Sequence, residues 1–245
     1  LMNSYAASMG LSNTLFQNST GLPDGNHFSS AKDLATMTSL LINNFPETYS
    51  LYKEKYFTFN DIRQPNRNRL LWKDNSSDGV KTGHTESAGY CLISSAKRND
   101  MRLIAVVAGA KSDKERFNDT QRLLEYGFRF YSTQEVIKKD NALKDVDVWG
   151  GKKNLVSLGA ENNIKLTLPR TTFRNITISY DFQNNLRAPI KEGQTLGTLV
   201  IKDGEKTLHT ENLVALSDVE AKGFFGRLWA SFVLWFRGLF GLGDA

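Results

Sequence analysis

The periodicity of apolar residues changes near residue 133, and this change limits what this chain of 245 residues can fold into. Residues 1–132 mix helical and strand-like periodicities, whereas residues 133–216 consist of short alternating stretches separated by turns. The first pattern predicts a mixed α+β domain, and the second predicts a small all-β sandwich. The sequence contains no internal repeat and no low-complexity linker, so we expect the two domains to be joined directly.

The first region predicts an antiparallel sheet with covering helices. A short helix is expected to end near Gly10, and a second helix is expected over residues 30–44. Strands are expected over residues 90–96 and 102–108, and the second is so continuously apolar that we expect burial on both faces. Residues 114–131 predict an amphipathic helix that covers the sheet. The apolar side chains available for this contact are Phe117, Leu123, Leu124, Phe128 and Tyr131.

Weaker signals mark the connections between these elements. Residues 57–60 alternate like a short strand, and the polar run over residues 63–69 predicts a loop or hairpin tip. The dipeptide Asp78-Gly79 predicts a turn that leads into residues 80–84.

Strand signals then continue through the second region. Residues 163–169 and 175–180 alternate between apolar and polar side chains, as half-buried strands do. Residues 200–207 predict a hairpin with Asp203-Gly204 at its turn.

Composition excludes several classes of protein. Cys91 is the single cysteine, so an internal disulfide framework is impossible, and we expect a small core residue at this position. The three histidines lack metal-ligand spacing, so we expect neither a metal nor a cofactor. The net charge of +5 is spread along the chain without an arginine-aromatic stripe, which disfavours nucleic-acid binding.

The beginning of the chain resembles a helix already under way. Residue Leu1 precedes apolar residues at helical spacing, without the basic and apolar regions of a signal peptide. We expect a fragment of a longer protein; a native start is the alternative.

The segment 217–245 is of a third kind. Ser217 and Glu220 have the spacing of a capping box and predict the start of a helix. Arg227 and Arg237 leave only nine residues between them, which disfavours a membrane-spanning helix, and the wide aromatic arc disfavours a terminal core helix. We favour an amphipathic helix that lies in the membrane interface. The predicted anchor residues are Phe224, Phe225, Leu228, Trp229, Phe232, Trp235, Phe236, Leu239 and Phe240.

The motif with the clearest chemistry is Lys81-Thr82-Gly83. On a strand at the edge of an acyl-transfer site, the lysine ammonium supplies positive charge for a substrate carboxylate, and the threonine hydroxyl donates or accepts beside it. The glycine lets the backbone approach a ligand closely. Three residues alone also occur by chance in surface hairpins, so the neighbouring sequence decides their meaning.

That neighbouring sequence resembles a known family. Residues 78–85 and 88–90 are similar to the third active-site motif of the low-molecular-mass penicillin-binding proteins, the D-alanyl-D-alanine carboxypeptidases that trim bacterial peptidoglycan. Residues 49–60 and 62–72 are also similar to this family. The resemblance covers nearly the whole chain, and a β domain and an amphipathic C-terminal helix follow in the family's order.

The resemblance implies three parts. Residues 1–132 would be the C-terminal part of a penicillin-binding or β-lactamase-like catalytic domain, residues 133–216 the β-sandwich domain, and residues 217–245 the membrane anchor. The implied location is the periplasmic face of the bacterial inner membrane.

Two motifs of the family are missing where they are expected. The pattern Ser-x-x-Lys occurs at residues 29–32, 50–53 and 94–97, at a helix start, before a strand and at a strand end. Only the first position is locally plausible, and there the serine, Ser29, is better interpreted as a helix N-cap. The pattern Ser-x-Asn does not occur. We expect the nucleophile, its lysine and the second motif to lie upstream of residue 1.

The mechanism implied by the resemblance is acyl transfer. A serine attacks the carbonyl between two D-alanines, its neighbouring lysine acts as base, and water hydrolyses the acyl-enzyme. A backbone N–H within residues 84–86 would help to hold the oxyanion. Lys81 would stabilise charge and assist proton transfer, Thr82 would bind the terminal carboxylate, and Gly83 completes the catalytic motif.

Four further residues are predicted to contact the substrate. His84 and Thr85 follow the motif, and the His84 side chain is expected either to take part in the chemistry or to shape the cleft. Arg116 and Arg67 match arginines that the family uses near the substrate carboxylate, although a surface arginine is often only a solvated charge.

The implied partners are peptidoglycan D-Ala-D-Ala peptides, β-lactam inhibitors and a membrane surface. A β-lactamase is an alternative that shares the motif, but it needs neither a β domain nor an anchor. A non-catalytic wall-binding or scaffold protein is the alternative from another class, and without a nucleophile the chain as given would act in this way.

Overall fold

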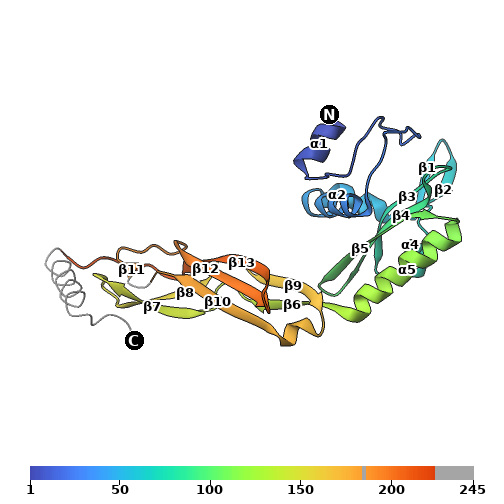
Figure 1. Cartoon of the computed structure of the whole chain (residues 1–245). Coiled ribbons are helices and arrows are strands. Elements are labelled where there is room, and N and C mark those ends of the chain that lie inside the picture. The colour runs from blue at the N-terminus through green and yellow to red at the C-terminus, as the bar shows by residue number, and fades with distance from the viewer. Residues whose placement is uncertain (184–185, 224–245) are drawn as a thin grey trace. The chain divides into compact units, whose positions relative to one another are not determined.

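The computed structural model describes residues 1–183 and 186–223 (Figure 1). They form two compact units, the first spanning Leu1–Ser132 and the second beginning at Thr133. The predicted membrane anchor over residues 224–245 lies outside the described residues. Within the described part of the chain, no helix has both the length and the apolar character needed to cross a bilayer.

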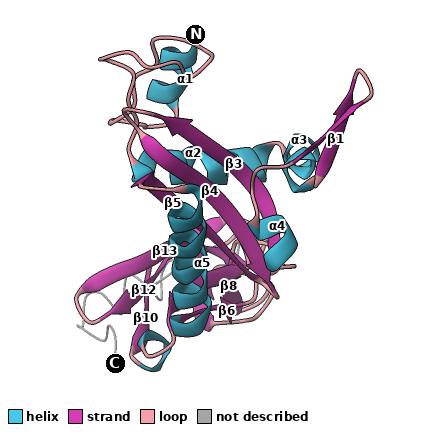
Figure 2. Cartoon of the chain, turned by 90° about the vertical axis from the view of Figure 1, so that its right-hand side faces the viewer, coloured by secondary structure: helices cyan, strands magenta, loops and turns pink. Residues whose placement is uncertain are grey.

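The first unit is built on an antiparallel sheet in the order β3-β4-β5. Helix α5 packs against β4 and β5, and helix α2 packs against β5; they cover opposite faces (Figures 1 and 2). The buried core between sheet and α5 is formed by Leu70, Leu92, Ala96, Met101, Ala105, Leu124 and Phe128. The elements of this unit are α1 (Met2–Ser8), α2 (Ala31–Asn44), α3 (Pro46–Tyr49), η1 (Ser50–Lys53), β1 (Tyr56–Phe59), β2 (Ile62–Pro65), α4 (Leu70–Lys73), β3 (Ser77–Thr85), β4 (Gly89–Arg98), β5 (Met101–Ala110) and α5 (Asp113–Phe130).

The expected helices and the two long strands are confirmed, with differences in detail. Helix α2 is capped by Ser30, whose hydroxyl accepts from the Asp33 N–H, and not by Ser29. Part of the predicted loop is strand β2, which pairs with β1. The predicted turn at Asp78-Gly79 is wrong, because both residues lie inside β3.

Strand β5 is less buried than expected. Met101, Ala105 and Ala110 are buried, but Ala108 is exposed. In α5, Leu123 is 49% exposed, so it does not cover the sheet as predicted. The strand β5 is the last strand of this sheet among the described residues, and Ala108 and Leu123 line the same open surface hollow beside it.

The second unit is made almost entirely of strands. A sheet in the order β10-β12-β13-β8-β7-β11 and a two-stranded sheet β6-β9 contribute side chains to one core, as in a β-sandwich. Deeply buried members of that core include Val156, Leu158, Ile164, Ile190, Leu199, Ile201, Leu213 and Val219. The elements are β6 (Tyr131–Ile137), β7 (Lys144–Trp149), β8 (Leu155–Ala160), β9 (Ile164–Pro169), η2 (Thr172–Arg174), β10 (Ile176–Phe182), β11 (Leu186–Arg187), β12 (Thr195–Asp203) and β13 (Lys206–Ala215).

The predicted hairpin is confirmed, but its turn lies one residue later. Asp203 pairs with Lys206, so the two loop residues are Gly204 and Glu205. Gly204 has φ +55°, a left-handed conformation that glycine adopts without steric cost.

The helix predicted to begin at Ser217 does not begin there. Val219 is 1% exposed and forms an antiparallel bridge with Ile190, because its apolar side chain completes the β core. Asp218, the second residue of the expected capping box, instead accepts from the Glu192 N–H, which lowers the pKa of that carboxyl. The amphipathic helix over the remaining tail residues stays a prediction.

Candidate active site

The Lys81-Thr82-Gly83 motif lies on β3 beside a groove of about 660 Å³. All seven residues predicted for the site line this groove, although they come from three separate parts of the first unit. The lining residues are Thr20, Gly21, Arg67, Lys81, Thr82, Gly83, His84, Thr85, Ala88, Tyr90, Cys91 and Arg116. The fold therefore brings together the residues that the motif and the resemblance selected, while their individual roles remain predictions.

Alternation along β3 distributes the motif between a buried and an exposed side. Val80 and Thr82 are buried, whereas Lys81 and Gly83 are exposed. The Lys81 ammonium donates to the Thr82 carbonyl oxygen. Although they alternate in burial, Lys81 and Thr82 both line the groove.

The beginning of β3 is held by side chains from distant parts of the chain. The Gly79 carbonyl accepts from Asn68 Nδ2 at 2.8 Å and from Ser94 Oγ at 3.0 Å. Asp78 accepts from the Tyr49 hydroxyl at 2.7 Å and from Arg102 at 2.8 Å. Burial and the neighbouring Asp78 carboxylate raise the pKa of the Tyr49 hydroxyl, which therefore stays protonated as a donor.

Gly79 allows this packing because it has no side chain. A Cβ at this position would lie 2.7 Å from the Tyr49 hydroxyl oxygen. The glycine therefore serves close approach inside a strand, which explains why the Asp-Gly pair does not form the expected turn.

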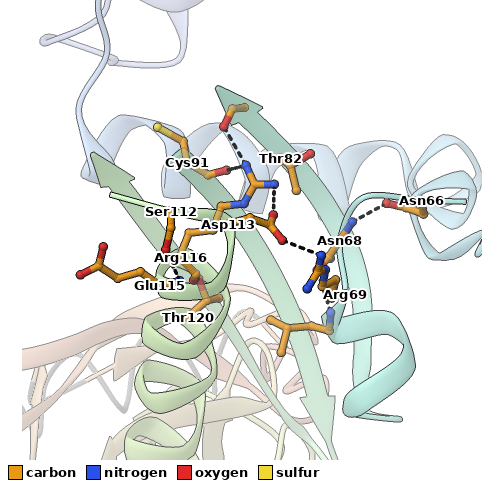
Figure 3. A network of polar contacts seen from close by, with 12 residues as sticks. Asn66, Asn68, Arg69, Thr82, Cys91, Ser112, Asp113, Glu115, Arg116 and Thr120 are labelled. Atoms are coloured by element: carbon orange, nitrogen blue, oxygen red, sulfur yellow. Dashed lines mark hydrogen bonds and ion pairs between the residues drawn. The ribbon is translucent and has the colours of Figure 1, made fainter. Parts of the chain in front are cut away.

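The other end of the motif is held by Arg116 (Figure 3). Its Nη1 donates to the Gly83 carbonyl at 2.9 Å and to the Cys91 carbonyl at 3.3 Å, while Nη2 donates to Asp113. Asp113 also pairs with Arg69 at 3.1 Å. The Arg116 side chain is only 7% exposed, so its donors serve the protein's own oxygens.

A capping box that the sequence analysis missed places Arg116. Ser112 Oγ accepts from the Glu115 N–H at 3.1 Å, and the Glu115 carboxylate accepts from the Lys111 N–H at 2.7 Å. The Ser-x-x-Glu signal was present in the sequence. It fixes the start of α5 and therefore the direction in which its first turn presents Asp113 and Arg116.

Aromatic contacts order the rest of the groove wall. The rings of His84 and Tyr90 lie 3.9 Å apart between centroids and 35° from parallel. The Arg116 guanidinium lies 5.3 Å from the Tyr90 ring centroid. Tyr90 therefore lies in contact distance of both residues and limits the positions that the His84 ring can take.

Arg67 differs from Arg116 in having no internal partner. Its side chain is exposed, and within residues 1–183 and 186–223 it forms no hydrogen bond or ion pair. A guanidinium whose donors are unengaged can bind an incoming carboxylate in a bidentate manner.

Cys91 is not the core residue that was expected. It lines the groove, partly exposed, and its Sγ lies 3.5 Å from the Ala88 carbonyl oxygen. The reason is its partner on β3: Gly83 lies opposite and has no side chain to cover it. Sequence alone gave no signal for this, because strand pairing decides it.

None of the serines in the three Ser-x-x-Lys patterns lines the groove. Ser29 Oγ lies 2.8 Å from Thr14 Oγ1, Ser50 donates to the Glu47 carbonyl, and Ser94 is fully buried against Gly79. In the described part of the chain, no cluster of three His, Cys, Asp or Glu side chains has a metal-binding arrangement.

Comparison with known families gives two matches, separated by residues 113–130. The family model of D-alanyl-D-alanine carboxypeptidase matches residues 1–112. The model of the C-terminal domain of penicillin-binding protein 5 matches residues 131–221. The first match falls within the first compact unit, and the second falls almost entirely within the second unit.

Individual relatives agree with these matches. The chain is 46% identical to D-alanyl-D-alanine carboxypeptidase DacC of Escherichia coli over 98% of its own length and 61% of the relative. It is 37% identical to DacF of Bacillus subtilis over 91% of its length and 59% of the relative. The chain thus spans about three fifths of the curated relatives it matches.

Solved structures give the same result. Penicillin-binding protein 5 from Haemophilus influenzae superposes with a TM-score of 0.76 at 40% identity, covering 89% of this chain and 64% of that one. The carboxypeptidase DacD from Francisella tularensis superposes with a TM-score of 0.62 at 31% identity, covering 90% and 67%.

Proposed function

This chain belongs to the D-alanyl-D-alanine carboxypeptidase family, and on that premise we propose that it supplies one wall of a serine-type carboxypeptidase site. The parent enzyme removes the terminal D-alanine from peptidoglycan pentapeptides through an acyl-enzyme. The single observation that carries the proposal is the convergence of Lys81, Thr82 and Arg67 on one groove.

The substrate's terminal carboxylate is bound by this wall. Arg67 offers an unengaged fork, Thr82 offers a hydroxyl, and Lys81 adds a positive charge between them and the reacting carbonyl. The peptide then lies along β3 with its scissile carbonyl near the backbone N–H of His84, which donates to the oxyanion.

The nucleophilic serine and its lysine come from a part of the parent protein that is not among these 245 residues. Support comes from the three Ser-x-x-Lys serines, none of which lines the groove: Ser29 and Ser50 are hydrogen-bonded elsewhere, and Ser94 is buried.

The chemistry proceeds by two acyl transfers. The serine oxygen attacks the carbonyl between the two D-alanines, its proton passes to the neighbouring lysine, and the D-alanine amine leaves with a proton. Water then cleaves the ester and regenerates the serine. A β-lactam carries a carboxylate and a strained amide in the same arrangement, so we propose that it acylates the same serine and inhibits the enzyme.

The tail holds this enzyme at the periplasmic face of the bacterial inner membrane. The supporting feature is the wide arc of aromatic and aliphatic side chains beyond Gly223 in the helical pattern of the tail sequence. Arg227 and Arg237 fall on the opposite, polar side of that pattern. A location against the membrane suits an enzyme whose substrate is cell-wall peptide.

The experiment measures D-alanine release from a pentapeptide by the full-length protein and its Thr82→Val and Arg67→Met variants. Loss of kcat/KM by on the order of tenfold or more in each is expected, because each removes a charged or polar contact to the carboxylate. Thr20→Val, at the rim of the same groove, is the matched control and should stay near wild type. Unchanged release by both site variants would refute the assignment of this wall.

A further inference from the structure

One end of the second unit is gathered around the point where the chain enters residue 224. Gly151 forms an antiparallel bridge with Ala221. Ile190 forms a second bridge with Val219, so the loop after β7 and the segment after β11 both lie beside the last described residues. We call this the tail-root end of the unit, and its segments are residues 150–155, 187–194 and 216–223 (Figure 1).

The tail-root end carries an excess of positive charge. Its three segments contain five cationic and three acidic side chains. Two of the acidic side chains are already paired, Glu220 with Lys152 and Asp218 with Lys191. The remaining cations are exposed and form no ion pair with another described residue; they are Lys153, Arg187 and Lys222. This end therefore presents unpaired cationic groups to solvent.

These cations lie next to the start of the predicted anchor. The Cα atoms of Lys222 and Phe224 are two peptide units apart, so they can be separated by at most about 7 Å. The Debye length at physiological ionic strength is about 8 Å, so a charge at Lys222 interacts with any charged surface that Phe224 enters. Lys153 is tied to the same point, because the Lys222 N–H donates to the Gly150 carbonyl oxygen at 2.7 Å.

We propose that the tail-root end is a second membrane contact, which binds the headgroups of anionic phospholipids while the tail lies in the membrane interface. The inference rests on the proposed location and goes beyond it, because it assigns lipid binding to the β unit and fixes which end of that unit faces the membrane. Lys153, Arg187 and Lys222 supply the electrostatic part of the attachment, and the tail supplies the apolar part.

The two contacts have complementary strengths. A single apolar anchor can give marginal, reversible binding, whereas an apolar segment combined with a basic patch gives stable attachment. Each basic side chain near an anionic surface strengthens binding by about fivefold. The basic end therefore reinforces the attachment that the tail makes and does not replace it.

The test measures co-sedimentation of the full-length protein with vesicles of phosphatidylcholine alone and of phosphatidylcholine mixed with phosphatidylglycerol. The test variant combines Lys153→Gln and Lys222→Gln, which removes two charges and no ion pair within the described part of the chain. At low salt it should bind the mixed vesicles on the order of tenfold more weakly than wild type and the neutral vesicles equally well. High salt should remove the difference.

The matched control removes two charges from the opposite end of the same unit. Lys206 lies there, because it pairs with Asp203 at the far end of β12. Arg174 lies near the same place, since Ile176, two residues later, pairs with Asp203 as well. The variant Arg174→Gln with Lys206→Gln has the same net charge as the test variant and should bind both kinds of vesicle as wild type does.

The inference is overturned if the test variant keeps the wild-type affinity for the mixed vesicles. It is also overturned if the control variant loses as much affinity, because net charge and not position would then explain the binding. A test variant that binds vesicles normally but loses binding to isolated peptidoglycan would assign this end to the wall polymer instead of lipid. A wild-type protein that sediments with neither kind of vesicle refutes the proposed location, so the two failures are distinguishable.

Discussion

Replacing Asn68 with alanine should release the beginning of the strand that carries the motif. Asn68 is 1% exposed, donates to the Gly79 carbonyl at 2.8 Å and accepts from the Leu70 N–H at 3.2 Å. The substitution removes both hydrogen bonds. Gly79 keeps Ser94 as a donor, but the Leu70 N–H, in a fully buried residue, loses its acceptor.

The magnitude follows from these contacts. Each hydrogen bond contributes roughly 1 kcal/mol net, and a buried N–H without a partner costs about 1–3 kcal/mol. The lost bond to Gly79 is counted at about 1 kcal/mol, and the unpaired Leu70 N–H at about 2 kcal/mol without counting its lost bond a second time. The expected destabilisation of the region is therefore about 3 kcal/mol. At about 1.4 kcal/mol per factor of ten, amides of β3 should exchange with deuterium on the order of a hundredfold faster.

Hydrogen exchange followed by mass spectrometry measures this effect on peptides that cover residues 77–85. Asn75→Ala is the matched control, because it makes the same change at an exposed position before the same strand. Peptides from β12 and β13, in the other unit, should exchange as in wild type for both variants. An Asn68→Ala protein whose β3 amides exchange within threefold of wild type would refute the reasoning.

Three further predictions concern other parts of the chain. Hydrogen bonds from Thr14 and the Asn13 N–H lower the pKa of Asp33 below its ordinary value of 3.8, so its contribution to stability is present above that pH and is lost as pH falls through the lowered pKa. Asp33→Asn should therefore abolish the acid-induced loosening of residues 12–16, measured by exchange; unchanged acid sensitivity would count against it. Gly79→Ala should lower the midpoint of thermal unfolding of the first unit and be partly rescued by Tyr49→Phe, since the added Cβ meets the Tyr49 hydroxyl; absence of rescue would contradict this explanation. Deleting residues 224–245 should abolish pelleting with anionic vesicles, and a truncated chain that still pelleted would disprove the anchor.

Local patterns predicted most elements of the first unit. The helical spacing near residues 30–44 and 114–131 and the apolar runs of β4 and β5 carry their own periodicity, so neighbouring residues suffice to identify them. Local patterns fail where contacts with residues distant in the sequence determine the backbone conformation. Asp78-Gly79 has the composition of a turn, yet contacts from Tyr49, Asn68 and Arg102 hold it inside a strand.

Two capping-box patterns illustrate the same point. Ser112 and Glu115 cap α5, whereas Ser217 and Glu220 have identical spacing and do not start a helix. The difference is Val219, whose burial in the β core holds the second pattern in an extended conformation. A capping-box pattern is compatible with a helix start, but packing of neighbouring residues in the core determines whether the helix forms.

The sequence predicted which residues lie together better than it predicted how their side chains are arranged. The motif and the resemblance selected seven residues that line one groove. They did not reveal that Cys91 lies in the groove or that Arg116 is turned toward the Gly83 carbonyl. Both facts depend on strand register and on the start of α5, which become visible only in three dimensions.

The most direct test of the central claim is an intact mass after incubation with penicillin, on this chain and on the full-length parent. The account predicts a penicilloyl adduct on the parent only, with Lys81, Thr82 and Gly83 forming one wall of a site whose nucleophile lies elsewhere in that protein. An adduct on the 245-residue chain would contradict this account, and peptide mapping would identify the reacting serine. No adduct on either protein would contradict the carboxypeptidase assignment itself.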